Sequence, residues 1–161
     1  VMANYYTHLA FEIKATHVDA ERFVQLIISA NAIDDSEAIL LGPEIEPAFR
    51  SEGKTAEQTL AEIVADFGLG VECLFNAEFG KLIVFDRDGA PNVWALAQCL
   101  QRLYPEKLPL GFVYAETCDK SREGGFGGGL FAIGSDTIVD HTLARMLDEE
   151  LAGLGEASDA T

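Results

Sequence analysis

Short segments with a two-residue apolar repeat alternate along this chain with longer segments whose apolar residues recur every three to four positions. In the first segment, from Tyr5 to Ala15, Leu9, Phe11 and Ile13 fall on one face, as in a half-buried β-strand. Further strands are predicted at residues 70–77, 81–86 and 110–117, and the short apolar run at residues 130–133 predicts another. The longer repeat predicts helices at residues 18–32, 55–67, 91–104 and 136–151.

The order of these segments is strand, helix, helix, strand, strand, helix, strand, strand, helix. It contains the β-α-β-β-α-β arrangement of ferredoxin-like domains. We therefore predict an α+β fold, a ferredoxin-like antiparallel sheet with helices on one face. The 161 residues fit a single domain, placed at residues 1–155 and followed by a disordered tail at residues 156–161. Residues 34–54 carry two prolines and two glycines and are interpreted as a connection, with at most a short strand at residues 38–41.

Capping residues and apolar faces predict where the helices begin and what they bury. Thr16 and Thr55 open capping boxes, and Asp136 is the predicted cap of the last helix. The predicted core consists of the apolar residues on the inner faces: Leu9, Phe11, Ile13, Phe23, Ile27, Val84, Trp94, Leu100, Phe112, Leu143 and Leu147.

The charge balance excludes several classes of partner. The chain has 27 acidic and 11 basic residues, a formal net charge of −16. Because nonspecific nucleic-acid binding depends on Lys and Arg that neutralise phosphates, we expect no direct binding of nucleic acid. The longest apolar runs are far shorter than the ~20 residues of a membrane-spanning helix, so we expect no membrane partner. With no signal-peptide pattern, we expect a cytoplasmic protein.

The cysteines give no sign of a disulfide framework or a metal site. Cys73, Cys99 and Cys118 are odd in number and widely spaced, so reduced thiols are expected. His8, His17 and His141 are scattered along the chain and form no recognisable ligand motif. We therefore predict no metal, no cofactor and no catalytic residue.

A glycine-rich run near the end of the chain is the best candidate for a binding site. Glycine is retained where the backbone needs positive φ or where another group comes close. The run does not lead into a helix and lacks the Gly-Lys-Ser/Thr ending of a phosphate-binding loop. Two interpretations stay open, a ligand-approach site beside the cations or a tightly packed hairpin made of glycine. The candidate ligand- or partner-binding residues are Glu116, Cys118, Lys120, Arg122, Gly124, Gly125, Phe126, Gly127, Gly128 and Gly129.

The residues from Phe112 to Arg122, followed by Phe126 to Gly129 and combined with the opening Met2 to Thr7, resemble a group of small uncharacterised bacterial and mobile-element proteins. More distantly, the strand that ends at Glu116 before a glycine turn is similar to the ferredoxin-like domain of plasmid-encoded YubB-type proteins. The resemblance implies the fold and transfers no activity.

Two functions from different classes follow from these observations. The first is a non-enzymatic acidic protein-interaction module with a basic protein partner, present as a homodimer joined through the exposed edge strand at residues 71–75. The alternative is a small-ligand-binding protein or small enzyme, with its site at the Gly124–Gly129 loop and the open sheet face. The first function is preferred and would use the acidic surface or the exposed strand edge to bind the partner. The bland interpretation of the same carboxylates is a solvated face that keeps the protein soluble.

Overall fold

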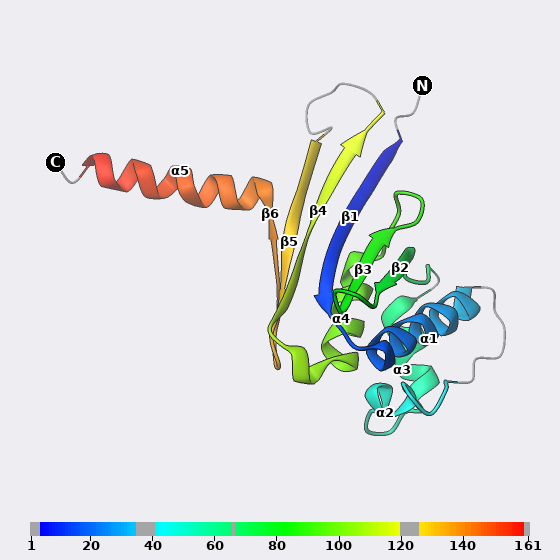
Figure 1. The fold of residues 1–161 in the computed structure, drawn as a ribbon. Helices are drawn as coiled ribbons and strands as arrows, with labels where there is room; N and C mark the ends of the chain where they lie inside the picture. Colours follow the sequence, from blue (N-terminus) through cyan, green and yellow to red (C-terminus); the bar gives the residue numbers. More distant parts are fainter. Residues whose placement is uncertain (1–3, 35–40, 66, 120–125, 160–161) are drawn as a thin grey trace.

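The computed structural model describes residues 4–34, 41–65, 67–119 and 126–159, and it shows an α+β fold (Figure 1). Six strands form one antiparallel sheet in the order β2-β3-β1-β4-β5-β6. The strands are β1 (Tyr5–Lys14), β2 (Val71–Asn76), β3 (Lys81–Asp86), β4 (Leu110–Cys118), β5 (Phe126–Ile133) and β6 (Ile138–Thr142). The predicted α+β class and antiparallel sheet are therefore confirmed.

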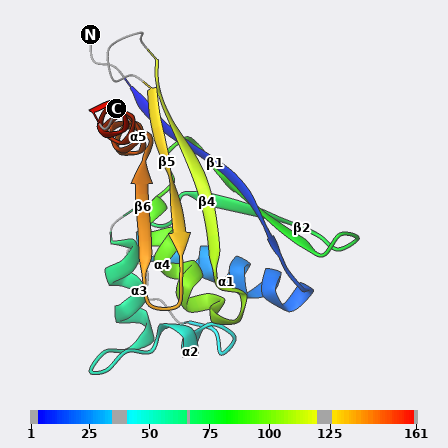
Figure 2. The ribbon, with the colours of Figure 1, turned by 90° about the vertical axis from the view of Figure 1, so that its left-hand side faces the viewer.

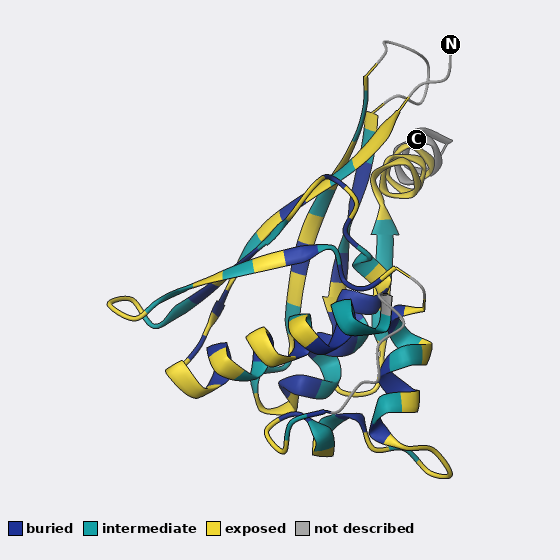
Figure 3. Ribbon diagram, turned by 90° about the vertical axis from the view of Figure 1, so that its right-hand side faces the viewer, coloured by how far each residue is buried: buried dark blue, intermediate teal, exposed yellow. Residues whose placement is uncertain are grey.

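In the described part of the chain, five α-helices accompany the sheet, and α1 to α4 pack near its lower half (Figure 1). They are α1 (His17–Asp34), α2 (Glu46–Phe49), α3 (Ala56–Val64), α4 (Val93–Leu103) and α5 (Leu143–Asp159), with a short 3-10 turn, η1 (Pro105–Lys107), after α4. Buried side chains from α1, α3 and α4 meet those of the sheet in one continuous core. Figure 3 shows that burial is concentrated in this lower part, while α5 is exposed along its described length.

The capping predictions for the first two helices are confirmed. The Thr55 hydroxyl accepts a hydrogen bond from the Gln58 amide at 3.2 Å, and the Gln58 side chain accepts one from the Thr55 amide at 2.9 Å. Thr16 and Asp19 exchange the equivalent bonds at the start of α1. These reciprocal bonds satisfy amides that have no partner within the helix, which explains why both helices begin where the sequence indicates.

A buried tyrosine connects the beginning of α1 to the end of α4. Tyr104 is fully buried, and its hydroxyl donates a hydrogen bond to the Asp19 carbonyl oxygen at 2.6 Å. Arg22 and Lys107 lie against its ring, and Lys107 also pairs with the Asp19 carboxylate at 2.9 Å. Partial burial acts to raise the pKa of Asp19, but hydrogen bonds from Thr16 and Lys107 outweigh it and lower that pKa.

The sheet separates along its length between β1 and β4 (Figure 2). These strands pair only from Tyr5 to Leu9 on β1, where Leu9 faces Tyr114. Beyond that point β1 continues beside β3, and β4 continues beside β5. The rings of Phe11 and Phe112 stack at 4.9 Å between the diverging strands and fill the upper part of the gap.

Asp86, the last residue of β3, bonds to β1 next to the point where the β1–β3 pairing ends. Its carboxylate accepts hydrogen bonds from the amides of Leu9 at 2.9 Å and Gly89 at 3.1 Å, and lies 3.3 Å from Nδ1 of His8. Partial burial acts to raise the pKa of Asp86, but these bonds outweigh it and the pKa is lowered. The side chain thus replaces a missing strand partner for the Leu9 amide.

The prediction of a single last helix from Asp136 is wrong. Residues 138–142 form β6, which pairs with β5 from Gly129 to Ile133, and the helix begins only at Leu143. The Gly134 amide bonds to the Thr137 carbonyl at 2.8 Å, so the chain reverses in a tight turn. The β-branched Ile138 then faces Ile133 across the hairpin, which favours a strand over a helical turn.

Other boundaries differ from the predictions in smaller ways. The connection between the first two predicted helices contains α2, which begins at Glu46 and carries Pro47 in its first turn, where proline is well tolerated. The second predicted helix ends at Val64 rather than near residue 67, because Ala65 has a positive φ of 50°. The strand considered at residues 38–41 lies almost wholly outside the described residues.

Most of the predicted core is confirmed, with three corrections. Leu9, Ile13, Phe23, Val84, Leu100 and Phe112 are buried, and Phe11 and Ile27 are half-buried against them. Trp94, Leu143 and Leu147 are instead 47%, 52% and 58% exposed. Trp94 keeps one edge on Phe131, with ring centres 5.0 Å apart, while both leucines belong to α5, which is not covered by the body of the protein.

Candidate functional site

Only part of the predicted glycine-rich site falls within the described residues. Lys120, Arg122, Gly124 and Gly125 lie outside them. Phe126 and the next three glycines belong to β5, where they pair with β4 from Thr117 back to Tyr114. The run therefore continues a strand of the sheet.

The described glycines are explained by close approaches within the sheet. A Cβ added to Gly129 would lie 2.5 Å from the His141 carbonyl oxygen and 2.9 Å from the Tyr114 hydroxyl. One added to Gly127 would lie 2.9 Å from Oε2 of Glu116, the end of a flexible, exposed side chain that can move aside. Gly128 has a φ of 138°, and a Cβ there would overlap the Tyr114 carbonyl oxygen. These contacts fit the tightly packed hairpin, one of the two interpretations of the run.

The side chains beside these glycines form a small acidic group. The Tyr114 hydroxyl lies 3.4 Å from Oδ1 of Asp140, on the face of the sheet that also carries Glu116. Partial burial raises the pKa of Tyr114, and the nearby Asp140 and Glu116 carboxylates raise it further. The raised pKa keeps the phenol in its neutral form at neutral pH, where it can donate a hydrogen bond to a carboxylate.

Among the residues that the structure describes, the cysteines and histidines do not form a metal-binding cluster. Cys118 is half-buried at the end of β4. Burial raises the pKa of both Cys73 and Cys99, which keeps these thiols protonated. Within the described parts of the chain, no three His, Cys, Asp or Glu side chains are placed to hold a metal ion.

Helix α5 is the most distinctive surface that the structure reveals. It starts after Thr142, whose hydroxyl accepts a hydrogen bond from the Arg145 amide at 3.3 Å, and extends away from the rest of the molecule (Figure 1). Its main contacts with other elements are with β5 and β6. Leu143, Leu147 and Leu151 are 52%, 58% and 57% exposed.

These leucines form one apolar stripe, because residues four apart lie almost above one another on a helix. Met146 lies on the same side of the helix and is also exposed. We call Leu143, Met146, Leu147 and Leu151 the α5 stripe. The sequence shows this periodicity, but a helical repeat does not reveal whether the apolar face meets the same chain or another molecule.

Acidic side chains lie within and around the face of α5 that carries the stripe. Asp148, Glu149 and Glu150 are all exposed, and Glu149 pairs with Arg145 at 2.7 Å along the same helix. The described part of α5 that carries the stripe is therefore negative as well as amphipathic. This combination is typical of a helix that binds an apolar groove with a basic rim.

Comparisons with other proteins add no functional assignment. No helix in the described residues combines the length and the apolar character needed to cross a membrane. No family model, curated protein or solved structure matches the chain.

Proposed function

We propose that this protein is a non-enzymatic, acidic protein-interaction module that presents α5 to a basic partner protein. The observation that carries the proposal is the α5 stripe, whose three leucines are each more than half exposed on a helix that leaves the body of the protein. The partner would provide an apolar groove for the stripe and cations for the surrounding carboxylates.

The energetics favour a covered stripe. Isolated helices are marginal in water, and most helical stability in proteins comes from packing of the apolar face. Burial of the exposed half of a leucine side chain contributes roughly 1 kcal/mol. Covering Leu143, Leu147 and Leu151 would therefore stabilise both α5 and the complex.

Charge favours a basic partner over a second copy of the chain. The net charge is −16, and the exposed Asp148 and Glu149 lie beside or behind the stripe, while Glu150 lies on the same helix face. Two copies that packed their α5 helices together would bring these carboxylates near one another, which opposes association. A basic groove would instead attract them.

We further infer that the body of the protein is a ferredoxin-like unit. The elements β1, α1, β2, β3, α4 and β4 follow the β-α-β-β-α-β order, with α2 and α3 inserted, and their strands lie in the order β2-β3-β1-β4. In this interpretation β5, β6 and α5 are an extension that carries the interaction helix. The β4–β5 glycine packing anchors that extension.

The test is site-specific photo-cross-linking from α5 in cells. A photoreactive residue at Leu147 should capture a basic protein, whose affinity for the purified chain is then measured against salt. Leu147→Asp should abolish binding, because it places a charge in the apolar contact. Ala152→Asp adds the same charge about 140° around the helix, given its 100° per residue, and should leave binding largely intact.

Three outcomes would contradict the proposal. They are cross-linking of Leu147 to a second copy of the chain, an equal loss of binding for Leu147→Asp and Ala152→Asp, and an affinity that salt does not change. Both variants should keep the melting temperature of the body, because the two side chains are exposed. A preserved melting temperature separates loss of binding from loss of folding.

A further inference from the structure

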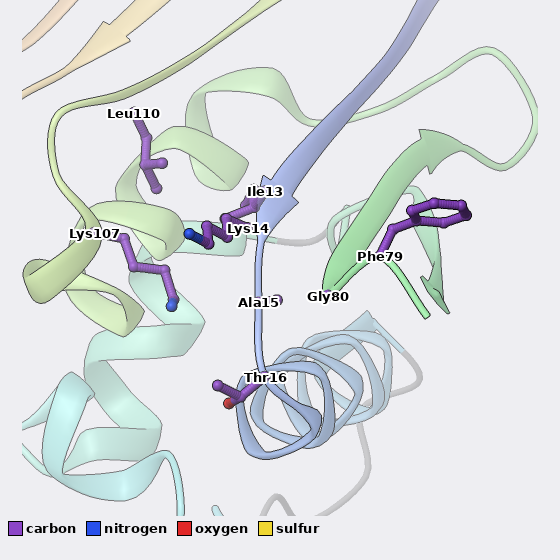
Figure 4. A pocket seen from close by; sticks show the side chains of 8 residues that line it. All are labelled: Ile13, Lys14, Ala15, Thr16, Phe79, Gly80, Lys107 and Leu110. Carbon is purple, nitrogen blue, oxygen red and sulfur yellow. The ribbon is translucent and has the colours of Figure 1, made fainter. Parts of the chain in front are cut away.

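A cleft of about 420 Å³ opens at the lower end of the gap between β1 and β4 (Figure 4). Its apolar lining includes Ile13 and Ala15 from the end of β1, Leu110 from the start of β4, and Phe79 from the β2–β3 turn. Phe79 is 65% exposed, so its ring forms an open rim. The cleft lies far along the sheet from the end that carries α5 (Figure 1).

Two lysines bring positive charge to this cleft in a strongly acidic protein. Figure 4 shows the side chains of Lys14 and Lys107 on the same side of the end of β1, opposite Phe79. None of the ion pairs between described residues involves Lys14. Lys107 pairs with Asp19, but an ammonium group has three N–H donors, so it keeps donors for a second acceptor.

The separation of the strands adds backbone polar groups to the same place. From Ala10 to Lys14, β1 pairs with β3 on one side, and its other side faces the gap. From Leu110 to Val113, β4 pairs with β5 and likewise turns its other side to the gap. The cleft thus combines an apolar lining, two amines and exposed strand edges, the features of a small-molecule site.

We propose that this cleft binds a small organic anion, with an apolar body against Ile13, Leu110 and Phe79 and a carboxylate or phosphate between Lys14 and Lys107. A carboxylate and a phosphate share the acceptor oxygens that the lysines recognise. The apolar lining disfavours an inorganic ion as the complete ligand.

The proposal is tested by titrating three probes that share a phenyl group. Phenylbutyrate carries a carboxylate, phenyl phosphate carries a phosphate, and phenylbutyramide is neutral. Binding is followed by calorimetry and by the amide NMR shifts of Ala15, Gly80 and Leu110. At least one anion should bind and shift these amides, the tighter anion identifies the head group, and the neutral amide should bind about tenfold more weakly or not at all.

Lys14→Gln and Lys81→Gln form a matched pair of variants. Both remove one charge, and the two residues face each other in the β1–β3 register, but Lys81 pairs with Glu12 and does not line the cleft. Lys14→Gln should weaken anion binding about tenfold, and Lys81→Gln should not. The proposal fails if the neutral probe binds as tightly as the anions, if both variants have equal effects, or if no probe binds at millimolar concentration.

Discussion

Replacement of Tyr104 by Phe removes one buried hydrogen bond and almost no packing. The hydroxyl donates to the Asp19 carbonyl oxygen at 2.6 Å, and the residue has no exposed surface. A net hydrogen bond contributes about 1 kcal/mol, and leaving a buried acceptor short of a donor adds to this, so we expect a loss of roughly 1.5 kcal/mol. For a chain of this size the melting temperature should fall by about 3 to 6 °C.

Urea denaturation of both proteins measures this loss, and Tyr114→Phe is the matched control. The Tyr114 hydroxyl is only half-buried and lies 3.4 Å from Asp140, so its removal should cost less than about 0.5 kcal/mol. Equal losses for the two variants, or a neutral Tyr104→Phe, would refute the idea that this bond fastens α1 to α4. A changed slope of free energy against urea would show instead that the unfolded state had changed.

The pH dependence gives a second measurement on the same residue. Burial, and then the nearby Asp19 carboxylate, raise the pKa of Tyr104 above its ordinary value of 10.0. Because the folded pKa exceeds the unfolded one, the stability from the neutral phenol is fully present below pH 10 and is lost as the pH rises beyond it. The difference between wild type and Tyr104→Phe should therefore shrink in that alkaline range.

Three further predictions follow from the sheet. Asp86→Asn should cost about 1 to 2 kcal/mol in urea denaturation. The Leu9 and Gly89 amides bond to different oxygens of the carboxylate, and an Asn side chain offers only one oxygen, so one of the two amides would lose its acceptor. The pKa of Asp86 is lower in the folded protein than its ordinary value of 3.8. The stability that the carboxylate contributes is therefore present above pH 3.8 and is lost as the pH falls through the folded pKa. Wild type should accordingly lose more stability in acid than Asp86→Asn. Gly128→Ala should cost roughly 3 kcal/mol or prevent folding, because its φ is positive and the Tyr114 carbonyl oxygen occupies the Cβ position. Gly42→Ala is the control, since its Cβ would meet open space, and it should change stability by less than about 0.5 kcal/mol. Equal melting temperatures for the two variants would contradict this prediction. We expect a dimer through the edge of β2, converted to monomer by Leu74→Lys, and light scattering that finds wild type monomeric at every concentration would reject it.

Local patterns were sufficient for the elements whose signals are local. The alternation of Leu9, Phe11 and Ile13 predicted β1, and the Thr55–Gln58 capping box predicted the start of α3. These features depend on neighbours within a few residues, so the local sequence is enough to predict them. The glycine run was recognised as a close-approach segment for the same reason, although what approaches Gly129 is the His141 carbonyl oxygen and the Tyr114 hydroxyl, on the two neighbouring strands.

Tertiary structure decided what each apolar face meets. Periodicity placed Leu143 and Leu147 on one face of a helix, and Trp94 on another, but burial depends on whether a distant element comes to cover that face. Ile138 could have extended the last helix, and only the hairpin partner Ile133 made its segment a strand. The point at which β1 separates from β4 is likewise set by where the pairing of these two strands stops, and they lie about a hundred residues apart in the sequence. Both the α5 stripe and the lysine-lined cleft follow from such long-range arrangements, because a residue stays on the surface only where no distant part of the chain covers it.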